Sequence, residues 1–292
     1  TVGIMLIPQG MAYAMIAGLP VVYGLYAALL PQIVYGFFGT SRHLAVGPVA
    51  MDSLLVAAGL AGMAVAGSDD CIALALLLAF MMGALQLGMG LLRLGFLVNF
   101  LSRPVINGFT SAAALIIGLN QLPHLLGVTS ERSNRLTSLL ANLGEALPYT
   151  SIGSLAAGGC AIVALAAMKR WAPKVPAALA VVVTGILTSW LVGFEAMGIA
   201  VVGVIPEGLP SFALPAWSMA DAQHLLPTAL TLSLVAFMEA ISVAKAIEDR
   251  QGYPVDANQE LRAIGAANAV GSLFGAYPTT GGFSRTAVNA RT

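Results

Sequence analysis

The chain has 292 residues, of which 58% are hydrophobic and 9% are charged, and its formal net charge is zero. Because soluble domains average about 25% charged residues, this composition excludes an ordinary soluble protein. The balanced charge provides no basic face, so we expect no nucleic acid as a partner.

Apolar runs long enough to cross a bilayer recur along the chain and predict an all-α polytopic membrane protein. The predicted spans are residues 2–18, 21–38, 44–63, 71–92, 104–120, 150–168, 174–192, 225–246, 261–275 and an incomplete span from 279. The connector 121–149 is polar, and 193–224 predicts a loop with a short interfacial helix near Trp217. Both chain ends lie in or beside apolar runs, so we expect a fragment of a longer protein.

The positive charges predict the orientation. With this span count, nine basic residues fall on one side, and the positive-inside rule makes that side, which includes the N-terminus, cytoplasmic. They are Arg42, Arg93, Arg103, Lys169, Arg170, Lys174, Lys245, Arg250 and Arg262. The other side receives only Arg132 and Arg135. We expect an integral protein of a bacterial inner membrane.

Two spans are interrupted near their middle. Residues 44–47 are predicted to be extended because proline disfavours helix in the residue before it, and Pro48 suits the first turn of a helix. The segment from Pro278 repeats this design, with extended Thr279 and Thr280, a break at residues 281–282 and a helix from about Ser284. Each break alone is also typical of a kinked helix or a tight helix contact.

The two interrupted spans, the third and the tenth, are seven spans apart, as a 7+7 inverted repeat predicts. Paired broken helices mark the midplane site of many transporters. Two facing half-helix N-termini favour an anion, because they carry free N–H groups and partial positive charge. Arg285 lies beside the second break, where a charge in the membrane is costly without an anionic partner.

At these residues the chain resembles the sulfate permease (SulP) family of anion transporters, whose relatives include prestin. The matching stretches are Pro8–Ala14, Gly24–Tyr26, Gly39–His43, Gly47–Ala50, Glu239–Ala244, Asn258–Leu261 and Phe283–Thr286. They occur in family order over essentially the whole chain.

The resemblance implies a uracil-permease-like fold of fourteen helices in a 7+7 inverted repeat, here truncated, with two half-extended, half-helical segments. Residues 1–100 would form the first part of a core domain, 101–193 part of a gate domain, 194–224 a connector and 225–292 the second part of the core. Spans 11–14 and the family's cytoplasmic STAS domain would be absent. We expect the full-length protein to be a homodimer.

Arg285 matches the arginine at the tenth-span helix start of the family, where its guanidinium would support a bound oxyanion. A buried salt bridge or a side chain that reaches the cytoplasmic surface is the alternative. The other predicted lining residues flank the two helix starts or share one face of the first span: Phe283, Ser284, Val49, Ala50, Gln9 and Tyr13. Ser284 would otherwise be an ordinary N-cap, and the others would pack between helices.

Glu239 lies in an otherwise apolar run, where a carboxylate must be protonated or find a cation. By resemblance to plant and bacterial relatives, it would couple transport to protons. Cotransported protons would offset the repulsion of sulfate by a negative cell interior. A static pair with Arg285 or Lys245 is the alternative.

Asp52 departs from the family pattern, which has an apolar residue there. An acid near the site would weaken anion binding unless it is protonated or paired with Arg285, and it would otherwise help to bind a cation. The simpler interpretation is a carboxylate that stabilises the helix start. The charges at 248–250 and 256–260 are expected to be solvated in a cytoplasmic loop.

The sequence therefore predicts a secondary transporter that takes up sulfate with protons, or with sodium, by elevator-like alternating access, without a cofactor. The alternatives are a bicarbonate or chloride carrier (sodium-coupled or an exchanger), an anion channel or motor, and a membrane sensor. Cys71 and Cys160 lack clustered partners, so no disulfide or metal site is predicted. No P-loop, dinucleotide fingerprint or nucleophile–base motif is present, which speaks against an enzyme.

Overall fold

The computed structural model describes residues 2–96, 103–128, 136–172, 175, 177–203, 205–215 and 217–290. Apart from the first two residues, the chain divides into two compact units. One comprises Gly3–Pro8 and Asn107–Ile205, and the other comprises Gln9–Ile106 and Pro206–Thr292. The predicted core and gate domains stay predictions, as does the motion between them.

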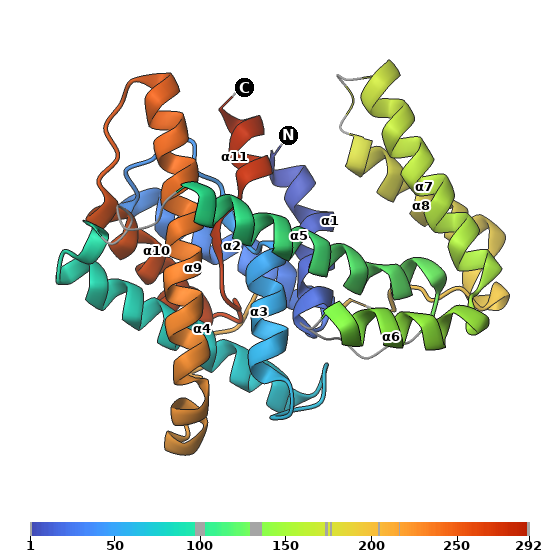
Figure 1. Cartoon of the computed structure of the whole chain (residues 1–292), viewed down its shortest axis with the longest axis horizontal. Helices are drawn as coiled ribbons and strands as arrows, with labels where there is room; N and C mark the ends of the chain where they lie inside the picture. Colours follow the sequence, from blue (N-terminus) through green and yellow to red (C-terminus); the bar gives the residue numbers. More distant parts are fainter. Residues whose placement is uncertain are drawn as a thin grey trace. The chain divides into compact units, whose positions relative to one another are not determined.

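The described elements are mostly helices (Figure 1). In chain order they are α1 Val2–Ala17, α2 Val21–Phe38, β1 Val46–Gly47, α3 Ala50–Leu60, α4 Asp69–Leu91, α5 Arg103–Leu126, α6 Leu136–Ala146, η2 Leu147–Tyr149, α7 Ile152–Trp171, α8 Ala177–Val192, η3 Phe194–Met197, α9 Met219–Gln251, α10 Ala257–Ser272, β2 Thr280–Gly281 and α11 Phe283–Asn289. Within the described ranges, helices long and apolar enough to cross a bilayer are found at Val21–Phe38, Asp69–Leu91, Ile152–Trp171 and Met219–Ile247.

The larger unit is built around α4, α9 and α10. Helix α4 packs against both α9 and α10, and α10 also packs against α2. Glycines allow the closest of these contacts, because a Cβ at Gly83 would lie 2.4 Å from the backbone nitrogen of Ala269 and a Cβ at Gly265 would lie 2.6 Å from that of Leu87. Small residues of this kind allow helix backbones to approach each other in a membrane.

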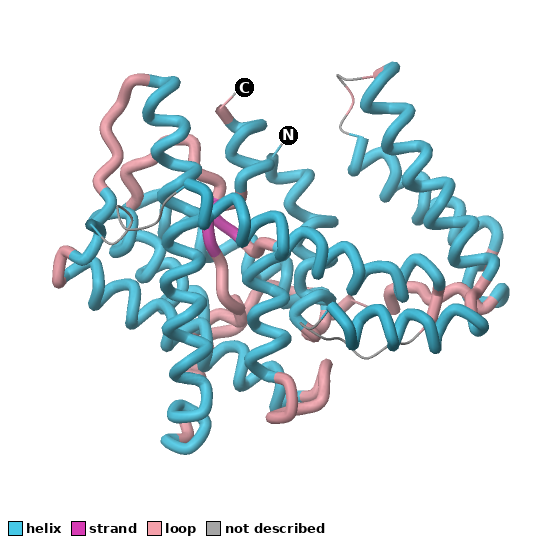
Figure 2. The backbone as a smooth tube through the Cα atoms, viewed as in Figure 1, coloured by secondary structure: helices cyan, strands magenta, loops and turns pink. Residues whose placement is uncertain are grey.

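A two-stranded antiparallel ladder lies inside this unit (Figure 2). Val46 pairs with Gly281, and Gly47 pairs with Thr280. Helix α3 follows the first strand and α11 follows the second, so both predicted half-extended, half-helical segments are present. The ladder satisfies the backbone groups that an interrupted helix would otherwise leave unpaired in the bilayer.

In the smaller unit, α7 packs against α8. Helix α7 begins at a conventional N-cap, where the Ser151 side chain accepts a hydrogen bond from the backbone N–H of Ser154.

Two connectors differ from their prediction. The first contains α6, an amphipathic helix that the polar composition of 121–149 obscured, since its leucines recur at helical spacing. In the second connector, a short interfacial helix was predicted near Trp217, but the described helical structure before Met219 is the η3 turn at Phe194–Met197. Helix α9 begins at Met219, six residues before the start of the span predicted from 225. Of the basic residues used to predict the orientation, Arg132, Arg135 and Lys174 lie outside the described residues.

Candidate functional site

Helices α3 and α11 both begin without a side-chain cap. Their N-cap residues, Val49 and Gly282, have extended backbones and no side chain that accepts a hydrogen bond. The first intrahelical bonds are made by the N–H groups of Ser53 and Thr286. The N–H groups before them have no carbonyl partner within the helix. In α3, which has 11 residues, these groups are suited to an anion.

Arg285 connects the start of α11 to the start of α3. Its guanidinium Nη1 donates a hydrogen bond of 2.6 Å to the carbonyl oxygen of Pro48. The side chain is only 2% exposed, yet its Nε and Nη2 atoms have no hydrogen-bond partner. A buried guanidinium with two free donors is costly unless an acceptor reaches it, and Nε with Nη2 can form the fork that binds an oxyanion.

At both glycines of the second break, neighbouring side chains leave no room for a Cβ atom. A Cβ at Gly282 would lie 2.6 Å from Nη2 of Arg285, and a Cβ at Gly281 would lie 2.6 Å from Leu44. Gly282 has a φ of −88°, which any residue adopts. The glycine there therefore leaves room for the guanidinium of Arg285.

Further hydrogen bonds join α11 to the segment before β1. The backbone N–H of Ala45 donates to Thr286 Oγ1 at 3.0 Å, and Gly282 N–H donates to the carbonyl of Ala45 at 3.0 Å. Asn289 Nδ2 donates to the carbonyl of His43 at 2.9 Å. The two interrupted segments are thus linked on both sides of the ladder.

Helix α1 carries two predicted lining residues, of which Tyr13 lies near the arginine. Tyr13 interacts electrostatically with Arg285. One turn earlier, the Gln9 side chain has a buried Oε1 atom without a hydrogen-bond partner. An amide with a free acceptor can turn to present its donors, so Gln9 is suited to a ligand.

The remaining predicted lining residues surround the two helix starts. Val49 and Ala50 are half-buried, whereas Phe283 is 52% exposed and Ser284 is also exposed. Ser284 is the second residue of α11, so the alternative role of N-cap does not apply to it, because Gly282 occupies that position. Arg285 contacts the residue before Val49, which brings the two interrupted spans together as the sequence predicted.

Two carboxyl groups lie beside this arrangement. Among the described residues, Glu239 of α9 makes no ion pair with Arg285 or Lys245, and Asp52 of α3 makes none with Arg285. Asp52 is fully buried, and neither of its oxygens has a hydrogen-bond partner. Helices α3 and α9 pack together, and the two carboxyl groups interact electrostatically.

A buried polar network behind β2 was not predicted from the sequence. Asn268 accepts a hydrogen bond from Thr279 N–H at 2.8 Å and donates to the Thr279 carbonyl at 2.9 Å, as a neighbouring strand would. It also donates to Gln86, whose amide donates to the carbonyl of Ser233. Polar residues inside the apolar fourth and ninth spans were the available signal.

The prediction that Glu260 is solvated is wrong. It lies in the first turn of α10 and is fully buried. Its carboxylate accepts hydrogen bonds from the Tyr35 hydroxyl at 2.8 Å, from Thr40 N–H at 2.7 Å and Oγ1 at 2.6 Å, and from Ser41 N–H at 3.0 Å. These donors stabilise the charge in place of water, and they fix the loop that leads from α2 to β1.

The chain is similar to known transport proteins in sequence. A model of the sulfate permease family matches residues 1–292. The chain is 44% identical over 296 residues to the chloroplastic sulfate transporter 4.1 of Arabidopsis thaliana, an alignment that covers 99% of this chain and 43% of the relative. The chain therefore spans less than half the length of that relative.

Solved structures of transporters have the same fold. Murine Solute Carrier 26 family member A9, an anion transporter in the inward-facing state, matches with a TM-score of 0.89 and 26% identity, over 99% of this chain and 51% of that chain. The transmembrane domain of the cyanobacterial bicarbonate transporter BicA matches with a TM-score of 0.87 and 25% identity, over 100% of this chain and 74% of that chain. These comparisons confirm the predicted all-α membrane fold with its 7+7 inverted repeat, and the relatives are transporters rather than enzymes, as predicted.

Proposed function

The chain belongs to the sulfate permease family, and from this we propose that it works in a secondary active transporter that takes up sulfate together with protons. The observation that carries this proposal is the buried guanidinium of Arg285, with two free donors beside the uncapped start of α3. The name of the Arabidopsis relative supports sulfate as the anion.

The proposed anion site combines three kinds of donor. The Nε and Nη2 atoms of Arg285 would bind two sulfate oxygens, since a forked donor matches an oxyanion. The free N–H groups of Ala50 and Met51 in the first turn of α3 would bind another oxygen. The hydroxyl of Tyr13 and the amide of Gln9 would complete the polar lining, with Val49, Phe283 and Ser284 at its margin.

We propose that the larger unit carries the anion as a rigid body, in an elevator-like motion. The cross-links from Arg285 to Pro48, from Ala45 to Thr286 and from Asn289 to His43 support this, because both helix starts must then move together. A rigid carrier keeps the geometry of its site while access alternates.

Proton coupling supplies the driving force in this proposal. Moving one charge across the membrane costs about 2.3 kcal/mol per 100 mV, so a sulfate dianion entering a negative interior costs about twice that. Glu239 lies in an apolar helix next to the site, and no partner neutralises it within the described residues. A proton that binds there with the anion would offset part of this cost.

Uptake of radiolabelled sulfate by the full-length protein in proteoliposomes tests the proposal. We expect uptake to rise when the outside is made acidic and to be lost in Arg285→Ala. Arg170→Ala, which removes an exposed arginine at the end of α7, is the matched control and should behave as the wild type. Absence of sulfate uptake at every pH would refute the proposed function.

Bicarbonate transport is the second candidate, because the structure matches a bicarbonate transporter closely. Labelled bicarbonate uptake that sulfate does not inhibit would favour it. The predicted cytoplasmic N-terminus, bacterial inner membrane and homodimer stay predictions.

A further inference from the structure

A second acidic residue accompanies Glu239 and has no function in the proposed site so far. Asp52 lies in the first turn of α3, it is fully buried, and both of its carboxyl oxygens lack a hydrogen-bond partner. A carboxylate that only stabilised the helix start would accept a hydrogen bond from a backbone N–H. Asp52 accepts none, so this simpler interpretation does not account for it.

Asp52 faces the seam between α3 and α9. Leu55 and Gly59 follow it at spacings of three and seven residues, and therefore share its face of α3. Gly59 lies so close to α9 that a Cβ there would be within 2.3 Å of the methyl carbon of Thr228. Thr228 in turn shares a face of α9 with Glu239, eleven residues later. Both acids thus belong to one interface between helices.

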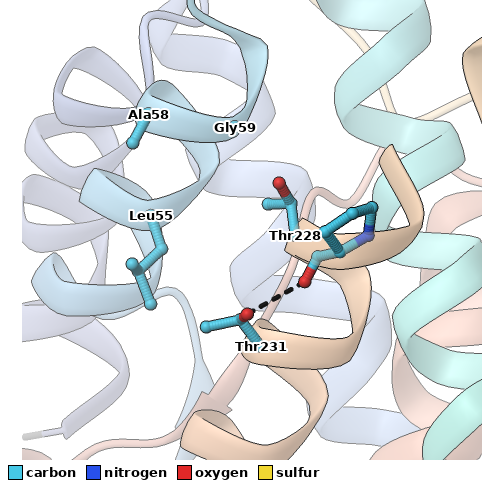
Figure 3. A pocket seen from close by; sticks show the side chains of 6 residues that line it. Leu55, Ala58, Gly59, Thr228 and Thr231 are labelled. Atoms are coloured by element: carbon cyan, nitrogen blue, oxygen red, sulfur yellow. Dashed lines mark hydrogen bonds between the residues drawn. The ribbon is translucent and has the colours of Figure 1, made fainter. Parts of the chain in front are cut away.

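A cavity of about 230 Å³ lies in the same seam (Figure 3). Leu55, Ala58 and Gly59 of α3 line it on one side, and Pro227, Thr228 and Thr231 of α9 line it on the other. The Thr231 hydroxyl donates to the Pro227 carbonyl at 2.9 Å. The cavity is large enough for several water molecules, and the threonine oxygens are partners for them. Water there would give protons a route towards the acids.

We propose that Asp52 and Glu239 bind protons as a pair, so that each sulfate dianion is carried together with two protons. The inference rests on the proposed function and adds the stoichiometry. One proton from the outer solution binds to each carboxylate before the anion is carried across, and both protons leave to the inner solution with the anion. Asp52 is fully buried and Glu239 is half-buried, and the two carboxylates repel each other, which favours their joint neutralisation.

Other titratable groups lie near Asp52. Tyr277, which precedes β2, interacts electrostatically with Asp52, and its hydroxyl lies 3.1 Å from Ser53 Oγ. Tyr277 also interacts with Tyr13 of α1 and Arg285 of α11. The tyrosines stay neutral through the cycle, so the charges that change are those of the two acids and the anion.

Charge accounting explains why two acids are useful. With both acids protonated and sulfate bound, the group that includes Arg285 carries one net negative charge. After sulfate and both protons leave, two carboxylates and one guanidinium again carry one net negative charge. The loaded and empty carriers therefore cross the membrane potential at equal cost. A carrier with Glu239 alone would move a net negative charge inwards.

The accumulation of sulfate in proteoliposomes, with the membrane potential clamped at zero and a pH gradient of about one unit, measures the stoichiometry. Each coupled proton contributes about a tenfold gradient, so the wild type should concentrate sulfate about 100-fold. Asp52→Asn should reach only about tenfold, and an inside-negative potential should inhibit this variant but not the wild type. The double variant Asp52→Asn with Glu239→Gln should show no accumulation but retain sulfate exchange.

Asp70→Asn is the control, since Asp70 is an exposed acid in the first turn of α4, and it should match the wild type. If the wild type concentrates sulfate only about tenfold, the proposal that two acids bind protons is wrong, although proton-coupled transport stands. This measurement uses the wild type alone, so it tests the proposal even if Asp52→Asn fails to fold. Accumulation driven by a sodium gradient instead of a pH gradient would also overturn the pair. A complete lack of sulfate uptake would instead refute the proposed function.

Discussion

The guanidinium Nη1 of Arg285 donates a 2.6 Å hydrogen bond to the carbonyl oxygen of Pro48, which lies 237 residues earlier in the chain. This contact joins the two interrupted segments at the point where both helices begin. It also fixes the orientation of the guanidinium, because Nη1 is bonded to the backbone. The other two nitrogens, Nε and Nη2, have no hydrogen-bond partner. The free donors are therefore preorganised for a ligand.

Arg285→Lys should weaken sulfate binding strongly although it keeps the charge. A lysine provides a point charge and cannot hold the Pro48 carbonyl and two anion oxygens in a fixed plane. The loss of one or more charge-assisted hydrogen bonds, at about 1.5–3 kcal/mol each, should raise the KM for sulfate by about 10- to 100-fold. Uptake kinetics in proteoliposomes would measure this, and an unchanged KM would contradict the proposed contact.

Gly282→Ala should have a similar effect without changing any charge. The added methyl group would collide with Nη2 of Arg285 and displace the guanidinium, although the backbone at this position accepts alanine. We expect a reduced affinity for sulfate with nearly normal thermal stability. Gly36→Ala is the matched control, since a Cβ there meets nothing within 4 Å, and a loss of affinity in both variants would argue against a specific effect.

Glu239→Gln should weaken the dependence of uptake on external pH. In the wild type, lowering the outer pH fills the acidic groups with protons and speeds uptake, whereas a glutamine is neutral at every pH. Sulfate uptake by Glu239→Gln should therefore respond less steeply to the outer pH than uptake by the wild type, because only Asp52 still binds a proton. Initial rates at a series of outer pH values would measure this, and an acid stimulation as steep as that of the wild type would place the coupling elsewhere.

Asn268→Ala should destabilise the larger unit. It would leave the backbone N–H and carbonyl of Thr279 without partners in a buried position, at a cost of about 2–4 kcal/mol. Thermal unfolding in detergent would show a lower Tm. Thr184→Ala is the control, because the Thr184 hydroxyl is exposed and bonds only to carbonyls of its own helix.

Glu260→Ala should release the loop after α2. The backbone N–H groups of Thr40 and Ser41 would lose their acceptor, and the hydroxyl of Tyr35 would keep only the Ser41 carbonyl, which should cost about 3 kcal/mol or more. Hydrogen exchange at Thr40 and Ser41 should become faster, whereas exchange within α7 should not change. Unchanged protection at these two amides would show that Glu260 does not hold the loop.

The sequence was sufficient to predict that the third and tenth spans are interrupted, because Gly47-Pro48 and Gly281-Gly282 are strong local signals. The helix after the second break starts at Phe283, one residue from the predicted position. Local signals do not, however, specify which distant groups meet. The bond from Arg285 to Pro48 and the pairing of Val46 with Gly281 depend on how the helices pack.

The errors have the same origin. Glu260 was predicted to be solvated because its neighbours are polar, but four donors supplied by Tyr35, Thr40 and Ser41 make its burial possible. Helix α6 was hidden because averaged polarity does not reveal an amphipathic pattern. In both cases the composition of a segment was informative, while the direction of its side chains decided the structure.

The ladder between β1 and β2 also has a consequence for biosynthesis. A nascent chain that has emerged only as far as α3 contains one strand whose partner has not yet been synthesised. Contacts between segments so distant in sequence form slowly, and unpaired backbone groups in a bilayer are costly. The backbone groups of β1 therefore stay without their ladder partners until β2 has been synthesised. During this stage membrane chaperones and proteases would recognise the chain.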